Sequence, residues 1–318
     1  MSVRIGLGLA GFPFSDVSEF WRWVDACEAG NVDSLWFSER LVSAQPFLEP
    51  VSALAALAGR TQRLKFGMNA VVLPLRDPLV LARECATVDY LSGGRLLPVF
   101  GVGNDASPEW QATGRAPAGR GARANEMLAL MTRLWSEERV TFHGKHFEYT
   151  DVSISPRPVQ SPLPLWIGGS SAAAIERTAR YGTGWLGGSG QTPAQAGATV
   201  AAIKAALVKT GRQIDDDHYG VGFAFRFGAW DEPVVQRAAA ALASRLAPGV
   251  DPREVIAVGG AGDILDLIDR FVPAGVSKFV LRPVASSGED FARQSLLLDR
   301  EVVSVVLRRQ GLEPVAST

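Results

Sequence analysis

The stretch LKFGMNAVVLPLRDPLVLARECATVDYLSGGRLLPVFGVGN, residues 64–104, holds two apolar runs separated by a helical pattern. Residues 64–73 are apolar and rich in β-branched side chains, and a proline ends the run. Across residues 78–91 the apolar side chains recur at helical spacing, and Ser-Gly-Gly follows, as glycine commonly does just past a helix. Residues 95–103 form the second apolar run, which ends in glycine. Two strands that are apolar on both faces and joined by a helix predict a parallel pair with a right-handed crossover.

The same alternation of strand and helix continues along the whole chain. The predicted strands lie at residues 3–9, 33–38, 64–73, 95–103, 163–168, 184–188, 220–227 and 278–284. The predicted helices lie at residues 17–29, 49–59, 78–91, 118–136, 170–181, 193–210, 233–246, 262–272 and 291–310. Eight strands, nearly all followed by a helix, predict an α/β protein with one (β/α)₈ TIM-barrel domain over residues 1–318. A doubly wound open sheet is the alternative, but no GxGxxG turn follows the first strand together with an acidic end to the second.

Two insertions interrupt this alternation, after the fourth and the seventh strands. After the fourth strand, residues 106–121 precede the next helical pattern, and the sequence VTFHGKHFEY follows that pattern at residues 140–149. Its His-Gly-Lys centre between alternating aromatic residues predicts a β-hairpin. After the seventh strand, two helical patterns occur before the eighth. Loops of this kind are where barrels differ in the substrates that they accept.

The composition excludes several classes of function. Hydrophobic residues make up 47% of the 318 residues, which suits a large core. The net charge is −1, from 32 basic and 33 acidic residues, and this balance argues against binding to nucleic acid or to an acidic membrane surface. The sequence has no run of about eighteen apolar residues and no secretory signal pattern, so we expect a cytoplasmic protein without a membrane span.

Cysteine and histidine are too few to indicate redox or metal chemistry. Cys27 and Cys85 both fall on apolar faces of helical patterns, where buried thiols in a reducing compartment are expected and a disulfide is the alternative. Only three histidines occur, and none forms a ligand cluster with cysteine or aspartate along the sequence. We therefore expect no metal site.

The end of the fifth predicted strand carries the most specific signal for a bound phosphate. Gly168 and Gly169 end this strand, and Ser170 and Ser171 begin an alanine-rich helix. Free backbone N–H groups and the helix dipole favour an anion at such a turn, and glycine allows it a close approach. The alternative is a tight turn with a serine cap that needs no ligand. The barrel fold favours phosphate, because its active sites lie at the carboxyl ends of the strands.

Charged and aromatic side chains also lie on the predicted strands or at their ends. Glu39 and Arg40 close the second strand, where they could act in catalysis or form a salt bridge on the barrel rim. Arg226 and Arg282 interrupt apolar strands. Because burying an unpaired guanidinium is costly, each should meet a carboxylate or, as the alternative, an anionic substrate or cofactor. The strand aromatics that we expect in the core, rather than in a stacking platform, are Trp36, Trp166, Trp185 and Phe225.

Two long motifs resemble the signatures of the bacterial luciferase-like flavin or deazaflavin oxidoreductases. The sequence GMNAVVLPLRDPLVLARECATVDYLSGGRLLPVFGVG, residues 67–103, is similar to the first signature. The sequence PLWIGGSSAAAIERTARYGTGWL, residues 164–186, is similar to the second. The two motifs occur in the same order as in the family and at the same separation along the chain. The resemblance covers essentially the whole chain. The segments GLGLAGFPF and HYGVGFAFRFG resemble a subgroup described as coenzyme F420-dependent oxidoreductases.

The resemblance implies a cofactor site, position by position. Members of the family hold their isoalloxazine or deazaflavin ring against a non-prolyl cis peptide at the end of the third strand, which corresponds here to Asn69 and Ala70. The loop that contacts the polar tail of the cofactor corresponds to Val102, Gly103 and the asparagine after them. The turn that binds its phosphate corresponds to residues 168–171.

This chain also departs from its relatives at three positions. Many relatives have an acidic residue and then a catalytic histidine after the second strand, where this chain has Glu39 and Arg40. Arginine stays protonated and is a poor general base, but it can hold an anionic substrate or stabilise developing charge. Some deazaflavin dehydrogenases place a glutamate proton donor where Asn104 stands, which speaks against a sugar-phosphate dehydrogenase mechanism. Luciferase has an arginine for the flavin phosphate where this chain has Val102, which favours the deazaflavin over FMN. Glu39, Arg40 and Asn104 are the candidate catalytic residues.

We therefore predict a luciferase-like oxidoreductase that transfers a hydride between coenzyme F420 and a small organic substrate. The alternative is an FMN-dependent monooxygenase, which would use molecular oxygen and reduced flavin from a separate reductase. A third interpretation, a flavin-binding protein without turnover, is supported only by the arginine at position 40. The family also implies a homodimer, for which the apolar face of residues 79–91 offers a surface.

Overall fold

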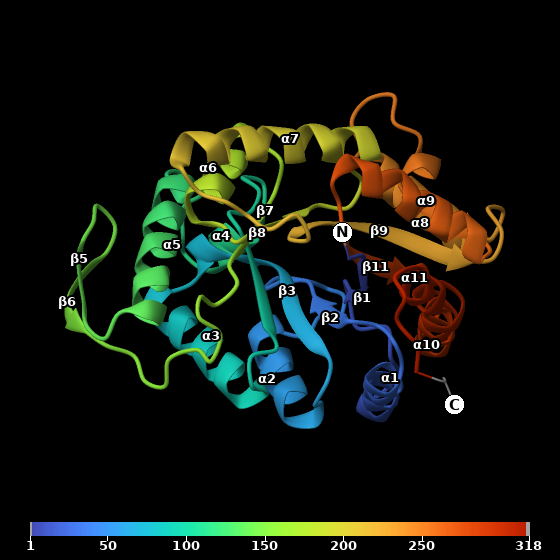
Figure 1. Ribbon diagram of the computed structural model, residues 1–318, viewed down its shortest axis with the longest axis horizontal. Coiled ribbons are helices and arrows are strands. Elements are labelled where there is room, and N and C mark those ends of the chain that lie inside the picture. The colour runs from blue at the N-terminus through green and yellow to red at the C-terminus, as the bar shows by residue number, and fades with distance from the viewer. Residues whose placement is uncertain (1, 316–318) are drawn as a thin grey trace.

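Eight parallel strands pair edge to edge until the last meets the first, and this closes them into a barrel (Figure 1). The computed structural model describes residues 2–315. The barrel strands are β1 Arg4–Leu9, β2 Ser34–Phe37, β3 Lys65–Val72, β4 Leu96–Gly101, β7 Trp166–Gly168, β8 Gly184–Gly187, β9 Tyr219–Phe227 and β11 Lys278–Pro283. Their order around the barrel is β11, β1, β2, β3, β4, β7, β8 and β9, and β9 pairs with both β8 and β11. The predicted (β/α)₈ barrel is confirmed.

Helices cover the outside of this barrel (Figure 1). They are α1 Val17–Ala29, α2 Pro50–Arg60, α3 Pro78–Ser92, α5 Arg120–Ser136, α6 Ala172–Tyr181, α7 Pro193–Thr210, α9 Ala261–Phe271 and α10 Gly288–Leu297. Several begin where the sequence places a cap. The Asp77 carboxylate accepts the N–H groups of Leu79 and Val80 at 2.9 and 3.0 Å at the start of α3. That helix ends at Gly93, whose φ of 66° lies in the left-handed region that glycine adopts without steric cost.

The interior of the barrel is filled by tryptophans that fit because the neighbouring strands carry glycine at the paired positions. Trp36 and Trp166 form an apolar layer with residues of β4, β8 and β11. A Cβ added at Gly67 would lie 2.6 Å from the Trp36 ring, and one at Gly184 would lie 2.4 Å from the Trp166 ring. Side chains other than hydrogen at these glycines would displace the rings. The predicted core aromatics, Trp36, Trp166, Trp185 and Phe225, are all 5% exposed or less, so this expectation is confirmed.

Both predicted insertions are present. After β4 come the short helix α4 Glu109–Ala112, helix α5, and the antiparallel hairpin of β5 Val140–His143 and β6 Glu148–Val152, which projects from the barrel wall (Figure 1). After β9 come α8 Pro233–Ala243, the 3₁₀ turn Pro252–Glu254 and an extra strand, β10 Ile256–Gly259. Ala224 and Phe225 of β9 pair with β10 on one edge and with β11 on the other. The sequence did not predict β10, which has four residues and lies outside the eight-strand rhythm.

The last helix also differs from its prediction. Instead of one helix over residues 291–310, α10 is followed by a π-helical segment, Leu298–Val303, and by α11 Ser304–Arg309. The N–H of Ser304 bonds to the carbonyl of Asp299, five residues earlier, as a π-turn requires. Helical periodicity in the sequence does not distinguish this wider turn from an α-helix. Within the described residues, no helix has the length and apolar character needed to cross a bilayer.

Candidate active site at the carboxyl ends of the strands

The carboxyl ends of β3, β4 and β7 meet at a point lined by residues with little or no side chain. A Cβ added at Gly101 would lie 3.6 Å from the Cβ of Ala70, and one added at Gly168 would lie 3.7 Å from it. The peptide bond between Asn69 and Ala70 is cis, as predicted for this position. The register of β3 against β4 also shifts here, between Met68 and Val71. We call this surface, formed by Ala70, Gly101 and Gly168, the cradle.

The predicted phosphate turn lies directly beyond the cradle, at the start of α6. Gly169 has a φ of 100°, and its carbonyl accepts the indole N–H of Trp185 at 2.7 Å, which fixes the turn from β8. The Ser171 hydroxyl oxygen accepts the N–H of Ala174 at 3.2 Å, so this serine caps the helix. Ser170 and Ser171 are both exposed. The serine cap of the ligand-free alternative is therefore present. It leaves the serine O–H groups at the turn available to an anion.

The loop after β4 packs closely against the end of β3. Gly103 has a φ of 72°, and a Cβ there would lie 2.9 Å from a methyl group of Val72 and 3.2 Å from the Trp110 ring. The carbonyl of Asn104 accepts the Trp110 indole N–H at 2.7 Å, and its side-chain oxygen accepts the N–H of Ala106 at 3.1 Å. The amide of Asn104 is exposed and retains its N–H groups as donors. The structure thus brings the loop that carries Val102 to within contact of β3.

Glu39 is buried and supports the end of β3. Its carboxylate accepts the N–H of Val72 at 2.7 Å and forms an ion pair with Arg76, which also pairs with Glu49 at 2.7 Å. Burial raises the pKa of Glu39, although Arg76 opposes this shift. Burial would lower the pKa of Arg76, but pairing with Glu39 outweighs it and raises the pKa. Glu39 is therefore a salt-bridge partner of Arg76, which is the second of the two roles that the sequence left open.

Arg40 lies outside this buried network, although it is the next residue in the chain. Its side chain is 49% exposed, and its Nη1 lies 3.8 Å from Oε1 of Glu109 in α4. This is a long and partly solvated ion pair, of a kind that contributes about 0–1 kcal/mol to stability. Arg40 therefore keeps most of its hydrogen-bonding capacity for a bound molecule at the mouth.

Arg226 meets the carboxylates that the sequence analysis expected. Its guanidinium pairs with Glu232 and Asp290 at 2.6 Å each and donates to the Val284 carbonyl at 2.9 Å. Burial acts to raise the pKa of Asp290, but the N–H of Ser286 and the guanidinium of Arg226 lower it to about 2. Arg226 thus joins β9 to α8 and α10 and is a structural cation.

Arg282 has no such partner. Its Nη2 donates to the Ser189 hydroxyl on the loop after β8, and no carboxylate within residues 2–315 forms an ion pair with it. Its aliphatic stem lies across β1, where a Cβ on Gly8 would come within 2.7 Å of the Arg282 Cγ. Burial lowers the pKa of Arg282, and the positive charge of Arg245 adds to the shift. Because the described part of the chain places no carboxylate beside Arg282, the other expected partner, an anionic substrate or cofactor, remains open for it.

Two arginines that the sequence did not indicate join α5 to α6 and to the loop after β4. Arg177 of α6 is buried, donates from Nε to Asn125 at 2.7 Å and reaches the carbonyl of Gly121 at 3.5 Å. Arg120, beside Gly121, pairs with Asp105 on the loop after β4. Arg177 thus ties α6, the helix that begins at the phosphate turn, to the start of α5, and Arg120 ties α5 to the loop after β4. Both arginines fall in predicted helices, but only the packing of α5 against α6 brings them together.

A cavity of about 360 Å³ opens in the other half of the mouth, between the loops after β1, β2 and β11. The N–H of Phe12 donates to the carbonyl of Pro46 at 2.9 Å and joins the first two of these loops. Gly8 and Arg282 line it from the strands, and Phe12, Phe47 and Phe291 line its sides. We call this cavity the mouth pocket.

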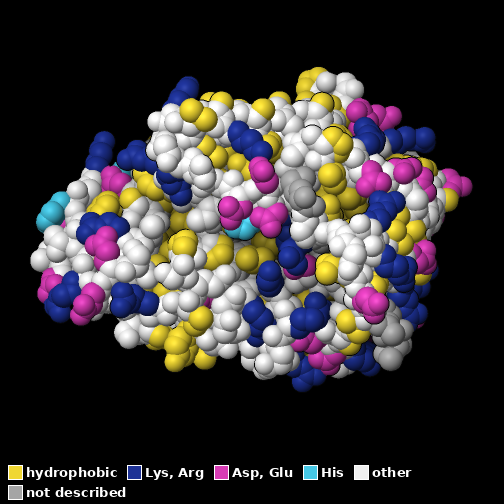
Figure 2. All heavy atoms as spheres, viewed as in Figure 1, with side chains coloured by type: hydrophobic (Ala, Val, Ile, Leu, Met, Phe, Trp, Pro, Cys, Tyr) yellow, Lys and Arg dark blue, Asp and Glu magenta, His cyan; other side chains and the backbone are white. Residues whose placement is uncertain are grey.

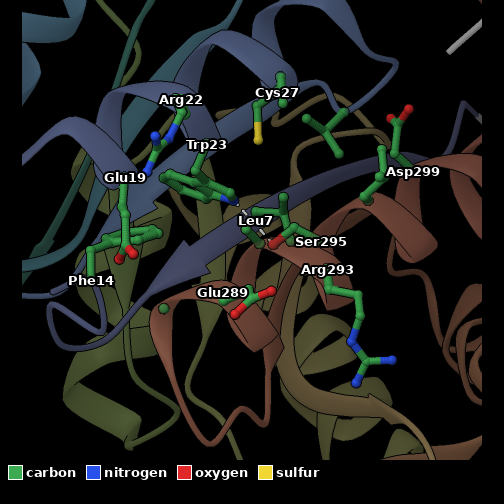
Figure 3. Close-up of a pocket in the computed structure, with 15 residues that line it drawn as sticks. Leu7, Phe14, Glu19, Arg22, Trp23, Cys27, Glu289, Arg293, Ser295 and Asp299 are labelled. Atoms are coloured by element: carbon green, nitrogen blue, oxygen red, sulfur yellow. Dashed lines mark hydrogen bonds between the residues drawn. The ribbon is translucent and has the colours of Figure 1, made fainter. Parts of the chain in front are cut away.

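A second cavity, of about 440 Å³, lies outside the barrel between α1 and α10 (Figure 3). Figure 3 shows Trp23 and the Cys27 sulfur facing it, and the Trp23 indole N–H donates to the Ser295 hydroxyl at 3.1 Å. None of the predicted site residues lines it. Burial raises the pKa of Cys27 far above its ordinary value, so this thiol is not a nucleophile. Cys27 and Cys85 are both buried and free, which confirms the prediction of unpaired thiols.

One histidine does lie near aspartates, contrary to the sequence analysis. Asp215, Asp217 and His218 have ligand atoms within 4.8 Å of one another. These residues lie within four positions of the chain, so the expectation that no histidine lies beside aspartate along the sequence was wrong. Figure 2 shows acidic side chains gathered around a histidine side chain near the centre of the face. The aspartates are exposed, and the group sits at the amino end of β9, opposite the mouth.

Comparisons with known proteins show which family the chain resembles. A family model described as luciferase-like monooxygenase matches residues 4–276. A protein of Nakamurella multipartita named F420-dependent glucose-6-phosphate dehydrogenase is 32% identical over 226 residues, which cover 67% of this chain and 65% of that protein. A protein of the same name from Kineococcus radiotolerans is 32% identical over 52% of this chain and 50% of its own length. The chain thus spans between half and two thirds of these relatives.

Solved structures share the fold. The monooxygenase RslO1 from Streptomyces bottropensis superposes with a TM-score of 0.77 at 22% identity, over 94% of this chain and 98% of that one. An F420-dependent secondary alcohol dehydrogenase, solved with an F420-acetone adduct, superposes with a TM-score of 0.78 at 17% identity, over 95% and 98%. At these identities the likeness concerns the fold alone.

Proposed function

The chain belongs to the luciferase-like monooxygenase family, and from this premise we propose that it is an oxidoreductase that uses coenzyme F420 to transfer a hydride to or from a small organic substrate. The cradle is the observation that carries this proposal. Ala70, Gly101 and Gly168 leave a surface without side chains at the ends of three strands, where a planar ring could approach the backbone. A tricyclic deazaflavin fits such a surface, and it supplies the hydride chemistry when bound.

The residues around the cradle fit an anionic cofactor tail. Ser170 and Ser171 offer hydroxyl groups at the N-terminus of α6, and the helix dipole favours an anion there. Arg177 adds positive charge on α6 itself, and Arg120 adds it at the start of α5, where it pairs with Asp105. We propose that the turn from Gly168 to Ser171 holds the phosphate and that the loop of Val102 and Gly103 contacts the adjoining part of the tail.

The candidate catalytic residues take different roles in this proposal. Glu39 bonds to the N–H of Val72 and to Arg76, so it would position the end of β3 and the cradle without touching the reacting atoms. Arg40 would stabilise negative charge that develops on the substrate, because a guanidinium donates hydrogen bonds but does not act as a base at neutral pH. Asn104 would orient a substrate or cofactor oxygen through its amide N–H groups.

An FMN-dependent monooxygenase is the second candidate. The description of the family model and the fold shared with a monooxygenase support it. The names of the relatives that are 32% identical support coenzyme F420, as does Val102 in place of the arginine that luciferase uses for its flavin phosphate. A homodimer also stays a proposal, supported by the apolar side chains that α3 exposes, Val80, Tyr90 and Leu91.

Cofactor titration tests this proposal. The purified protein is titrated with oxidised coenzyme F420 and, separately, with FMN in phosphate-free buffer, and cofactor fluorescence is followed. We expect saturable binding of F420 and much weaker binding of FMN. The variant Ala70→Leu should lose this binding because the larger side chain fills the cradle, whereas Ala201→Leu on the exposed face of α7 should not. Tight binding of FMN alone would replace the proposal with the monooxygenase.

A further inference from the structure

The cradle and the mouth pocket occupy opposite halves of one barrel mouth. The cradle lies at β3, β4 and β7, whereas the mouth pocket lies at β11, β1 and β2. In the order of strands around the barrel, the two groups adjoin where β2 pairs with β3, and β8 and β9 separate them on the other side. A molecule in the mouth pocket would therefore face a ring held on the cradle. This makes the mouth pocket the place where the substrate would bind.

Among residues 2–315, Arg282 is the one charged side chain that lines the mouth pocket. It points into the barrel, because it is two residues beyond Val280, which packs in the interior layer. Only its Nη2 has a partner among residues 2–315, the neutral hydroxyl of Ser189, so Nε and Nη1 remain to donate. Arg245 adds a second positive charge nearby. The planar fork of a guanidinium matches the two oxygens of a carboxylate.

The rest of the mouth pocket is almost without polar side chains. Half of its lining residues are phenylalanine or proline, and Gln45 is the second polar side chain among the described residues; they are Phe12, Phe47, Phe291, Pro13, Pro46 and Pro283. A sugar phosphate would bring several hydroxyl groups that need partners, and each one buried without a partner costs binding energy. A carboxylate attached to an apolar or aromatic body meets no such cost.

We propose that the mouth pocket takes a substrate with an apolar or aromatic body and a single carboxylate, which Arg282 holds. This rests on the proposed function, because it places the substrate opposite the cofactor. It also separates this chain from relatives named glucose-6-phosphate dehydrogenases. Arg282 is then the residue that selects the class of substrate.

Direct binding tests the proposal without turnover. Phenylpropanoate, its neutral amide phenylpropanamide and glucose 6-phosphate are titrated calorimetrically into the protein, with and without bound cofactor. We expect the carboxylate to bind at least about tenfold more tightly than the amide, since hydrogen bonds to charged groups are worth about 1.5–3 kcal/mol. Arg282→Met should remove this preference. Arg282→Lys, which keeps the charge but loses the fork, should retain part of it, and Arg83→Met on the exposed face of α3 should keep all of it.

Three outcomes would overturn the proposal. The amide could bind as tightly as the carboxylate, glucose 6-phosphate could compete as well as phenylpropanoate, or Arg282→Met could leave carboxylate binding intact. The cofactor titration separates a failure here from a failure of the proposed function. If Arg282→Met weakens F420 binding but not carboxylate binding, Arg282 serves the cofactor and the substrate assignment is wrong. If FMN binds instead of F420, the cofactor is wrong while the carboxylate result stands on its own.

Discussion

Two cations on the same strand, Lys278 and Arg282 of β11, meet opposite surroundings inside the barrel. Lys278 lies at the amino end, is 4% exposed, forms an ion pair with Asp33 and donates to the Ser34 hydroxyl at 2.9 Å. Arg282 lies at the carboxyl end on the same face of the strand and has no carboxylate among the described residues. The cation at the amino end is therefore paired within the protein, whereas the cation at the carboxyl end can still pair with a bound anion. A cation with a serine but no carboxylate as its partner among the described residues supports the proposal that an anion binds at this end.

Breaking the ion pair at the amino end should have the largest effect on stability. In Asp33→Asn, Lys278 would lose its buried partner, and removing one member of a buried pair typically costs about 3–5 kcal/mol. We expect a loss of that size in the free energy of unfolding, measured by urea denaturation at pH 7. Asp25→Asn is the matched control, because it removes an exposed pair with Arg60 at 2.7 Å and should cost less than about 1 kcal/mol. Equal losses in the two variants would contradict the comparison.

Lowering the pH should also weaken the pairing of Asp33 with Lys278, with a smaller loss of unfolding free energy. Burial acts to raise the pKa of Asp33, but Lys278 and Lys65 lower it to about 2, and Asp290 also has a pKa of about 2. Because these values lie below that of an unfolded aspartate, about 3.9, the stabilisation is complete above pH of about 4. It is lost as the pH falls toward 2, by about 2–3 kcal/mol for each group.

Urea denaturation between pH 6 and pH 2 measures this loss. In Asp290→Asn the fall in unfolding free energy between pH 4 and pH 2 should be shallower than in the wild type, because one of the two groups no longer titrates. Asp25→Asn is the control and should keep the slope of the wild type, because it leaves Asp33 and Asp290 in place and removes only an exposed pair with Arg60. A slope unchanged in Asp290→Asn would mean that the carboxylate is not held ionised in the fold.

Removing the cation at the carboxyl end should affect stability least. Arg282→Met leaves no carboxylate unpaired and keeps an apolar stem across Gly8, so we expect the free energy of unfolding to change by less than about 0.5–1 kcal/mol. The same urea denaturation at pH 7 measures it, beside Asp33→Asn. A loss as large as that of Asp33→Asn would make Arg282 a structural cation and remove the distinction between the two ends.

The sequence did not separate Arg226 from Arg282. Both interrupt apolar strands, and both were expected to find a carboxylate. Arg226 pairs with Glu232, at the start of α8, and with Asp290, in α10. Arg282 finds a serine. The difference depends on which loops reach each guanidinium, and sequence patterns carry no information on that.

The candidate site also combines features that the sequence predicted with features that only the structure shows. The motif around residues 67–103 was enough to place a cis peptide between Asn69 and Ala70, and the structure has it there. The turn of Gly168 to Ser171 was predicted from glycine and serine at a strand end, and it forms as a capped helix start. The roles of these residues toward a cofactor stay predictions. The burial of Glu39, the approach of Arg120 to the loop after β4, and the mouth pocket required tertiary contacts to be seen.

By itself the sequence determined the barrel, because each strand and helix has a local pattern that neighbouring residues are sufficient to specify. It missed β10, whose four residues are too short for a pattern, and the π-turn at Leu298–Val303, which has helical spacing. Tertiary structure alone decided which charges are paired and which are free. The physical reason is that electrostatic pairing depends on distances between residues far apart in the chain, such as Asp33 and Lys278, and closing the barrel sets those distances.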